Sequence, residues 1–162
     1  MLGHHAEAIE SALKGLQSAE FSLARNARPD DGQGSSVLLG LRALPAHCDG
    51  VVIALADQPL INAADIAALT TAFAQRGSAQ MVVPTRDGTP GNPVVIDASL
   101  RQEWQNLGAD WVGHRWRKAN PQRVHCLNTD NPNYFLDIDT PHDLERFAQT
   151  TGKTLLWPSQ DA

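Results

Sequence analysis

The chain has 162 residues, of which 42% are hydrophobic and 19% are charged, and its formal net charge is −5 at pH 7. These values are typical of one ordinary globular domain, and the acidic balance argues against binding polymeric nucleic acid through phosphate neutralisation. The apolar runs are strand-sized and the N-terminus lacks a signal-peptide pattern, so we expect no membrane segment and a cytoplasmic location. Cys48 and Cys126 have no CxxC spacing, which favours reduced thiols. We expect a single domain over residues 1–162.

The first half of the chain alternates helical and extended patterns. Ile9, Leu13 and Leu16 fall on one helical face, and Gly15 is a stop signal near the end of that helix. In order, the patterns predict a helix over 4–15, a short strand over 20–26, a loop over 27–34, a helix over 35–45 that Ser35 or Ser36 caps, a strand over 50–56 and a helix over 63–77 that Asn62 caps.

The second half continues this alternation. It predicts strands over 80–84 and 93–97, helices over 99–107 and 111–120, strands over 123–127 and 134–138, and a helix over 140–152 that Thr140 caps. The continuous apolar run "VVIALA" suits a central strand that is covered on both faces. Strands that alternate with helices indicate an α/β fold: a doubly wound, mostly parallel sheet with helices on both faces.

Asp57 is the first candidate for a functional side chain. It follows the most apolar strand, in "VVIALADQP", and ligands of open α/β sheets bind beyond the carboxyl ends of the strands. A carboxylate at that edge is well placed to ligate Mg²⁺, which prefers oxygen ligands. The alternative is that Asp57 only caps a turn, since aspartate often does so after a strand.

A second acidic group follows the last predicted strand, in "LDIDTP". Asp137 and Asp139 alternate with Ile138, so an extended chain would place both carboxylates on the same side. Two strand ends that carry acids could hold one magnesium ion against the phosphates of a nucleotide. The alternative for one of the two acids is that it helps to cap the helix that follows.

Several segments together resemble the MobA-like nucleotidyltransferase family, and most closely its molybdenum cofactor cytidylyltransferases. The matching segments are "GHHAEAI", Asn26, "GQGSSVLLGL", "VVIALADQP", "GNPVVI" and "DIDTPHDL", which span nearly the whole chain. The resemblance implies that CMP passes from CTP to the molybdopterin cofactor with release of pyrophosphate, with Asp57 and Asp139 as catalytic Mg²⁺ ligands and Asp137 as a further metal ligand. A molybdoenzyme is an expected partner.

The same resemblance assigns binding residues. Asn26 matches a position near the nucleotide, although Ala27 replaces the proline usual beside it, and the loop residues Gly32, Gly34, Ser35 and Ser36 are expected to hold part of the nucleotide or acceptor. A plain helix cap is the alternative for the serines. Gly91, Asn92 and Pro93 match a segment beside the acceptor, or else form a turn before a strand. Arg115 could meet a phosphate or lie on a solvated helix face.

A diagnostic part of the family pattern is missing. Relatives carry a glycine-rich loop after their first strand, ending in an arginine and a lysine, and here Lys14, Lys118 and Lys153 are the only lysines and none follows such a turn. We therefore expect an N-terminally truncated family member with impaired transfer, whose unpaired strand edge favours a homodimer or a rearranged sheet. The alternatives are a non-catalytic module that binds a cofactor or partner, and a guanylyl-type transferase with another acceptor.

Overall fold

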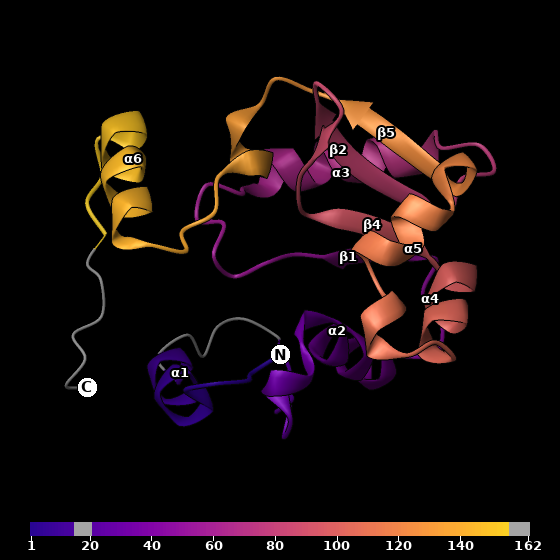
Figure 1. Cartoon of the computed structure of the whole chain (residues 1–162), viewed down its shortest axis with the longest axis horizontal. Coiled ribbons are helices and arrows are strands. Elements are labelled where there is room, and N and C mark those ends of the chain that lie inside the picture. The colour runs from indigo at the N-terminus through magenta and orange to yellow at the C-terminus, as the bar shows by residue number, and fades with distance from the viewer. Residues whose placement is uncertain (15–20, 156–162) are drawn as a thin grey trace. The chain divides into compact units, whose positions relative to one another are not determined.

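The computed structural model describes residues 1–14 and 21–155, and the chain divides into two compact units. Unit 1 consists of Met1–Val51, Ser78–Met81 and Ile96–Val124, and unit 2 consists of Val52–Gly77, Val82–Val95 and His125–Ala162. Figure 1 labels the helices and strands. The expected helix stop at Gly15, the expected contact of Leu16 and the first residue of the strand predicted over 20–26 lie outside the described residues.

The sheet has five strands in the described residues. They are β1 (Gly50–Ile53), β2 (Met81–Arg86), β3 (Thr89–Pro90), β4 (Val94–Asp97) and β5 (Val124–Asn128). The hydrogen-bonded order is β1-β4-β2-β3, and β5 also pairs with β2. Strands predicted over 50–56, 80–84, 93–97 and 123–127 are therefore present, and the two-residue strand β3 is an addition. β1 stops at Ile53 and stands at one end of the hydrogen-bonded order in the described residues, so the expectation that "VVIALA" forms a central strand is wrong.

The expected mostly parallel sheet is wrong, because the sheet is mixed and largely antiparallel. β2 and β3 pair antiparallel with Thr85 opposite Pro90. Only residues 87–93 separate β2 from β4, which is too short for the crossover that parallel neighbours need. The chain therefore turns back through β3, and the backbone bonds Gly91 N–H to Pro84 O (2.8 Å) and Asp97 N–H to Gln80 O (2.9 Å) follow an antiparallel register.

The predicted helices are all present, with shifted ends. The described residues contain α1 (Ala6–Leu13), α2 (Gln33–Ala43), α3 (Ala63–Ala74), α4 (Ala98–Gln105), α5 (His114–Ala119) and α6 (Pro141–Thr151), together with the 3-10 helices η1 (Pro29–Asp31), η2 (Ala109–Trp111), η3 (Pro121–Arg123) and η4 (Pro132–Phe135). Within this described part, none of the helices combines the length and the apolar character needed to cross a bilayer.

A buried arginine joins two helices of unit 1. Arg101 of α4 is 7% exposed, and its guanidinium donates hydrogen bonds to the carbonyls of Leu41 (2.8 Å), Leu44 (2.8 Å) and Pro45 (2.6 Å). These carbonyls lie at and beyond the C-terminal end of α2, where helical carbonyls lack intrahelical partners and the helix dipole favours a cation. Arg101 therefore replaces water as the partner of these groups.

Unit 2 is built around α3. Its N-terminus carries the predicted cap, because the Asn62 side chain accepts from the Ala64 N–H (2.9 Å) while Asp65 accepts from the Asn62 N–H (3.0 Å). Figure 1 shows α3 beside β2 and β5. The apolar side of α3 completes a core whose buried members are Leu69, Ala72, Val82, Val95 and Tyr134. Burial of this apolar surface is the main force that holds α3 to the strands.

The strand predicted over 134–138 is absent. Residues 132–135 form η4, and residues 136–139 have no regular secondary structure. The strand over 20–26 is likewise reduced, in its described part, to one isolated bridge between Leu2 and Arg25. α6 begins as predicted, since Asp143 accepts from the backbone N–H of Thr140 at 2.8 Å, and it ends at Gly152 with φ 68°.

Candidate functional site

Asp57 lies in the turn that follows β1, where the sequence predicts it. Its side chain is half-buried, and the carboxylate oxygen Oδ1 is buried with no hydrogen-bond partner in the described residues. A buried carboxylate oxygen without a partner is costly, because it has lost its hydration and gained nothing in exchange. Such an atom fits a group that binds a cation or another ligand.

Three separated segments of unit 2 meet beside Asp57. The Asp57 carbonyl accepts from the Ile138 N–H at 2.9 Å, which fixes the 137–139 segment next to the turn. The carbonyl of Tyr134 accepts from the Asn92 N–H (3.0 Å) and from the Gln58 side-chain amide (3.3 Å). The structure therefore brings together the Asp57 turn, the segment that contains Asn92 and the acidic segment.

Gly91 is required for this close approach. A Cβ atom on Gly91 would lie 2.4 Å from the Tyr134 carbonyl oxygen and 2.9 Å from the Phe135 ring, which is inside van der Waals contact. Gly91 and Pro93 are buried, and the Asn92–Pro93 peptide bond is cis. A larger residue at position 91 would push the 134–135 backbone away.

The charge state of Asp57 reflects its surroundings. Burial raises the pKa of the Asp57 carboxyl above its ordinary value, and a bond from its own backbone N–H opposes this rise. The negative charges of Asp139 and Asp137 then raise the pKa further. Asp57 is thus within electrostatic reach of both acids, and their mutual repulsion is the force that a bound cation would relieve.

The fit of a metal ion is limited by the number of protein ligands. Within residues 1–14 and 21–155, no three His, Cys, Asp or Glu residues converge closely enough to hold a metal ion. Mg²⁺ is commonly held by one or two carboxylates, with waters and substrate phosphates as its other ligands. The unpartnered Oδ1 of Asp57, with one of the two acids Asp137 and Asp139, is consistent with this incomplete kind of site.

The other predicted binding residues lie in unit 1. The side-chain amide of Asn26 donates to the hydroxyls of Ser35 (2.8 Å) and Ser36 (3.0 Å), so these three residues form one cluster. α2 begins at Gln33, and its N-cap position is Gly32, at φ 88°, without a side-chain cap. The predicted caps at Ser35 and Ser36 are therefore wrong, because both serines lie inside the first turn.

Packing within unit 1 requires glycine at position 34. A Cβ atom on Gly34 would lie 1.9 Å from the backbone oxygen of Ala109, so α2 can pack against η2 only without a side chain here. The close approach that this glycine permits is an approach to the protein's own backbone. The predicted ligand contact of Gly34 remains a prediction.

Gln58 and Tyr134 are members of the Asp57 site that sequence reasoning missed. Gln58 is 7% exposed and Tyr134 is 2% exposed. The only sequence signal for Gln58 was its position directly after Asp57. Tyr134 carried no such signal, because the strand predicted over 134–138 implied a different backbone.

The fold of the chain is shared with several solved structures. The structure is similar to Rv0371c of Mycobacterium tuberculosis H37Rv (21% identity, TM-score 0.70, covering 91% of this chain and 73% of that one) and to a manganese complex of the same protein (23%, 0.68, 91% and 75%). It is also similar to molybdopterin-guanine dinucleotide biosynthesis protein A of Archaeoglobus fulgidus (17%, 0.59, 89% and 75%). These likenesses show that the chain shares the α/β fold of these proteins.

The sequence gives the family itself. The model of the MobA-like NTP transferase domain matches residues 3–124, which is more than half of the chain. The chain therefore belongs to the MobA-like NTP transferase domain family. No curated protein matches it significantly.

Proposed function

We propose that the chain is a nucleotidyltransferase that acts on a nucleoside triphosphate and a phosphorylated acceptor. An oxygen of the acceptor phosphate attacks the α-phosphorus, the bond from that phosphorus to the oxygen bridging to the β-phosphate breaks, and pyrophosphate leaves. The observation that carries the proposal is the buried, unpartnered oxygen of Asp57 beside a second acidic segment. Membership of the MobA-like family supports the reaction class.

The residues of unit 2 would prepare this reaction. Asp57 and either Asp137 or Asp139 would hold a magnesium ion, which supplies charge neutralisation for the phosphates when it is bound. The hydrogen bonds to the carbonyls of Asp57 and Tyr134 keep the segments in register, so no large rearrangement is needed on binding. No general base is required, because the attacking phosphate is already anionic.

We propose CTP as the donor and a molybdopterin-type phosphate as the acceptor. The support is the combination of "ADQP" and "GNPV", which resembles the cytidylyl branch of the family. The A. fulgidus neighbour is named for molybdopterin-guanine dinucleotide biosynthesis, which favours the same acceptor but makes GTP the second candidate donor. A molybdoenzyme would then receive the product.

The test begins with binding. The chain is titrated with Mn²⁺ or Mg²⁺ and then with CTP or GTP in calorimetry, and pyrophosphate release is followed with molybdopterin present. Asp57→Asn should lose metal-dependent nucleotide binding at least tenfold, because it removes one carboxylate charge. Asp130→Asn is the matched control, since Asp130 is an exposed acid of the same unit.

The outcomes separate the candidates. Asp57-dependent binding of CTP with pyrophosphate release supports the proposal, and a preference for GTP would replace the donor. Asp57-dependent binding without release would support a retained site in a transferase of impaired activity, and absence of nucleotide binding would support the non-catalytic module instead. Equal binding by wild type and Asp57→Asn would falsify the assignment of the site.

A further inference from the structure

Gln58, the residue that follows Asp57, carries a further buried acceptor without a partner. The residue is 7% exposed, and its side-chain oxygen Oε1 is buried with no hydrogen-bond partner in the part of the chain that the structure describes. A buried amide oxygen that has lost its water and found no donor lowers the stability of a fold. This oxygen has no role in the proposed transfer reaction.

The Tyr134 carbonyl sets the orientation of the Gln58 amide. The Nε2 group of Gln58 donates to the Tyr134 oxygen at 3.3 Å, and this oxygen also accepts from the Asn92 N–H at 3.0 Å. The reverse orientation of the amide would place two acceptor oxygens against each other, so Oε1 is the atom that faces away from Tyr134. Oε1 is therefore left for a donor that the described residues do not supply.

Asp57 and Gln58 are held against the same segment of unit 2. The Asp57 carbonyl accepts from the Ile138 N–H at 2.9 Å, while the Gln58 side chain bonds to Tyr134, so both residues of the turn lie on residues 134–138. Each of the two consecutive residues carries one buried oxygen without a partner among the described residues. Two such acceptors favour a ligand that brings positive charge together with several donor hydrogens. A hydrated divalent cation brings both.

A neutral amide oxygen suits the waters of such a cation. Mg²⁺ keeps several waters when one or two carboxylates bind it, and each of these waters directs its hydrogens away from the ion. A carboxylate acceptor adds negative charge to the site, whereas the Gln58 amide accepts a hydrogen bond without adding charge beside Asp57. Groups that hydrogen-bond to the ligands of a metal typically change its affinity by about 10- to 100-fold.

We propose that Gln58 is a positioning residue of the Asp57 site, whose Oε1 accepts a hydrogen bond from a water molecule on the divalent cation that Asp57 holds. The proposal rests on the metal site of the proposed function and adds a residue that orients the hydration of the ion. The bond from Nε2 to the Tyr134 carbonyl keeps the amide in place, so the acceptor is oriented before the ion arrives.

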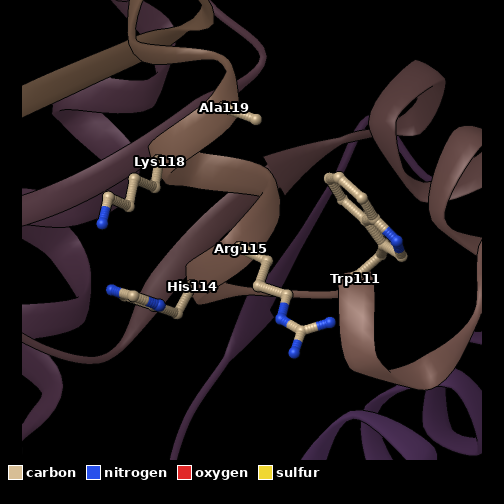
Figure 2. A pocket seen from close by; sticks show the side chains of 5 residues that line it. All are labelled: Trp111, His114, Arg115, Lys118 and Ala119. Carbon is tan, nitrogen blue, oxygen red and sulfur yellow. The ribbon is translucent and has the colours of Figure 1, made fainter.

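The surface depression of unit 1 is a poor place for a cation. It is lined by Trp111, His114, Arg115, Lys118 and Ala119 (Figure 2). Figure 2 shows Arg115 extending toward Trp111, while His114 and Lys118 point to one side of α5. This lining contains no carboxylate, and the positive charges of Arg115 and Lys118 repel a divalent ion. We therefore expect no binding there that would obscure a measurement at Asp57.

The test is the affinity of the full chain for Mn²⁺, measured without nucleotide from the electron paramagnetic resonance signal of the free ion. Gln58→Met keeps the length of the side chain and removes both polar atoms, so Mn²⁺ should bind about tenfold more weakly. The melting temperature without metal should change little, because the Tyr134 carbonyl keeps the Asn92 N–H and an unpartnered oxygen is removed. Gln149→Met, at an exposed glutamine of unit 2, should change neither quantity.

Gln58→Glu separates the acceptor from the donor. It keeps an oxygen at Oε1 and replaces the group that donates to Tyr134, so Mn²⁺ should bind at least as tightly as to wild type. A residue that only ties the turn to Tyr134 would instead lose Mn²⁺ binding equally in Gln58→Glu and Gln58→Met. Near-ultraviolet circular dichroism confirms that each variant is folded.

Asp57→Asn distinguishes failure of this proposal from failure of the proposed function. It should weaken Mn²⁺ binding at least tenfold, because it removes one carboxylate charge. Asp57-dependent binding that Gln58→Met leaves unchanged, or that both Gln58 variants weaken equally, would overturn the role of Gln58 and leave the metal site in place. Absence of Mn²⁺ binding by wild type, or binding that Asp57→Asn does not reduce, would overturn both.

Discussion

The carboxylate of Asp65 accepts a hydrogen bond from the side-chain amide of Asn131 at 2.7 Å, which ties the first turn of α3 to the turn before η4. Its other oxygen accepts from Asn133 at 2.9 Å, and the Tyr134 hydroxyl donates to the Asp65 carbonyl at 2.8 Å. The Tyr134 carbonyl also accepts hydrogen bonds from Gln58 and Asn92. Asp65 therefore fixes the backbone segment that positions the residues of the candidate site.

These hydrogen bonds of Asp65 predict that Asp65→Ala strongly lowers the stability of the fold. Asp65 is 4% exposed, and its substitution leaves the half-buried side-chain amides of Asn131 and Asn133 and the Asn62 N–H without their partner. We expect the free energy of unfolding to fall by about 3 kcal/mol. Urea unfolding followed by circular dichroism measures it, with Asp130→Ala as control, which should change stability by less than about 0.5 kcal/mol. Similar losses in both variants would contradict this role of Asp65.

Two glycines of α2 should respond in opposite directions. Gly34→Ala places a Cβ 1.9 Å from the Ala109 carbonyl oxygen, so we expect a loss of at least about 2 kcal/mol. Gly40→Ala meets only the flexible Met1 side chain, at 3.2 Å, and should stabilise the helix by up to about 1 kcal/mol. Thermal unfolding of the two variants checks the prediction, which would be wrong if Gly34→Ala melted at or above the wild-type temperature.

We expect Glu103 of unit 1 to stabilise the folded protein at neutral pH and to lose this effect in acid. The hydrogen bond from Arg123 is the main cause that lowers the pKa of Glu103 below its ordinary value of 4.5, and the Trp116 indole adds to it against the effect of burial. A lowered pKa contributes stability above 4.5 that is lost as the pH falls through the folded-state value. Glu103→Gln should therefore cost about 1 kcal/mol at pH 7.

The same variant should lose less stability than wild type between pH 5 and about pH 3, since it has no carboxylate to protonate. Denaturant midpoints measured across that range give the comparison. Parallel pH profiles for wild type and Glu103→Gln would show that the Arg123 contact has no electrostatic effect on stability.

The contribution of Asp57 to the stability of the fold should change with pH in the opposite direction to that of Glu103. Its pKa is raised in the folded protein, so ionised Asp57 destabilises the fold, and the benefit of protonation is fully present only below the ordinary value of 3.8. Asp57→Asn should therefore melt at a higher temperature than wild type at pH 7 without metal. That advantage should vanish below pH 3.8.

With manganese present at neutral pH, wild type should melt at a higher temperature than Asp57→Asn. Binding to the native state alone stabilises wild type by an amount that grows with the logarithm of the ion concentration, whereas Asp57→Asn should gain little. Melting temperatures with and without Mn²⁺ make the measurement, and Asp130→Asn should follow wild type. An equal gain in all three proteins would place the metal elsewhere.

Local patterns predicted the helices and several of their ends. Asn62 caps α3, Asp143 receives the Thr140 N–H, and Gly152 ends α6, because caps depend on side chains only a few residues apart. The acidic segment at Asp137 and Asp139 was likewise visible as a motif, although the strand expected before it was not formed.

The sequence by itself determined the family, the helical segments and the identity of the acids that the transferase proposal needs. Only the tertiary structure decided that β4 returns antiparallel to β2, that the backbone of Tyr134 bridges Gln58 and Asn92, and that Gly91 and Gly34 lie against distant carbonyls. The physical reason is range: capping and helical periodicity act within one or two turns, whereas strand direction and close backbone approach depend on residues far apart in the chain.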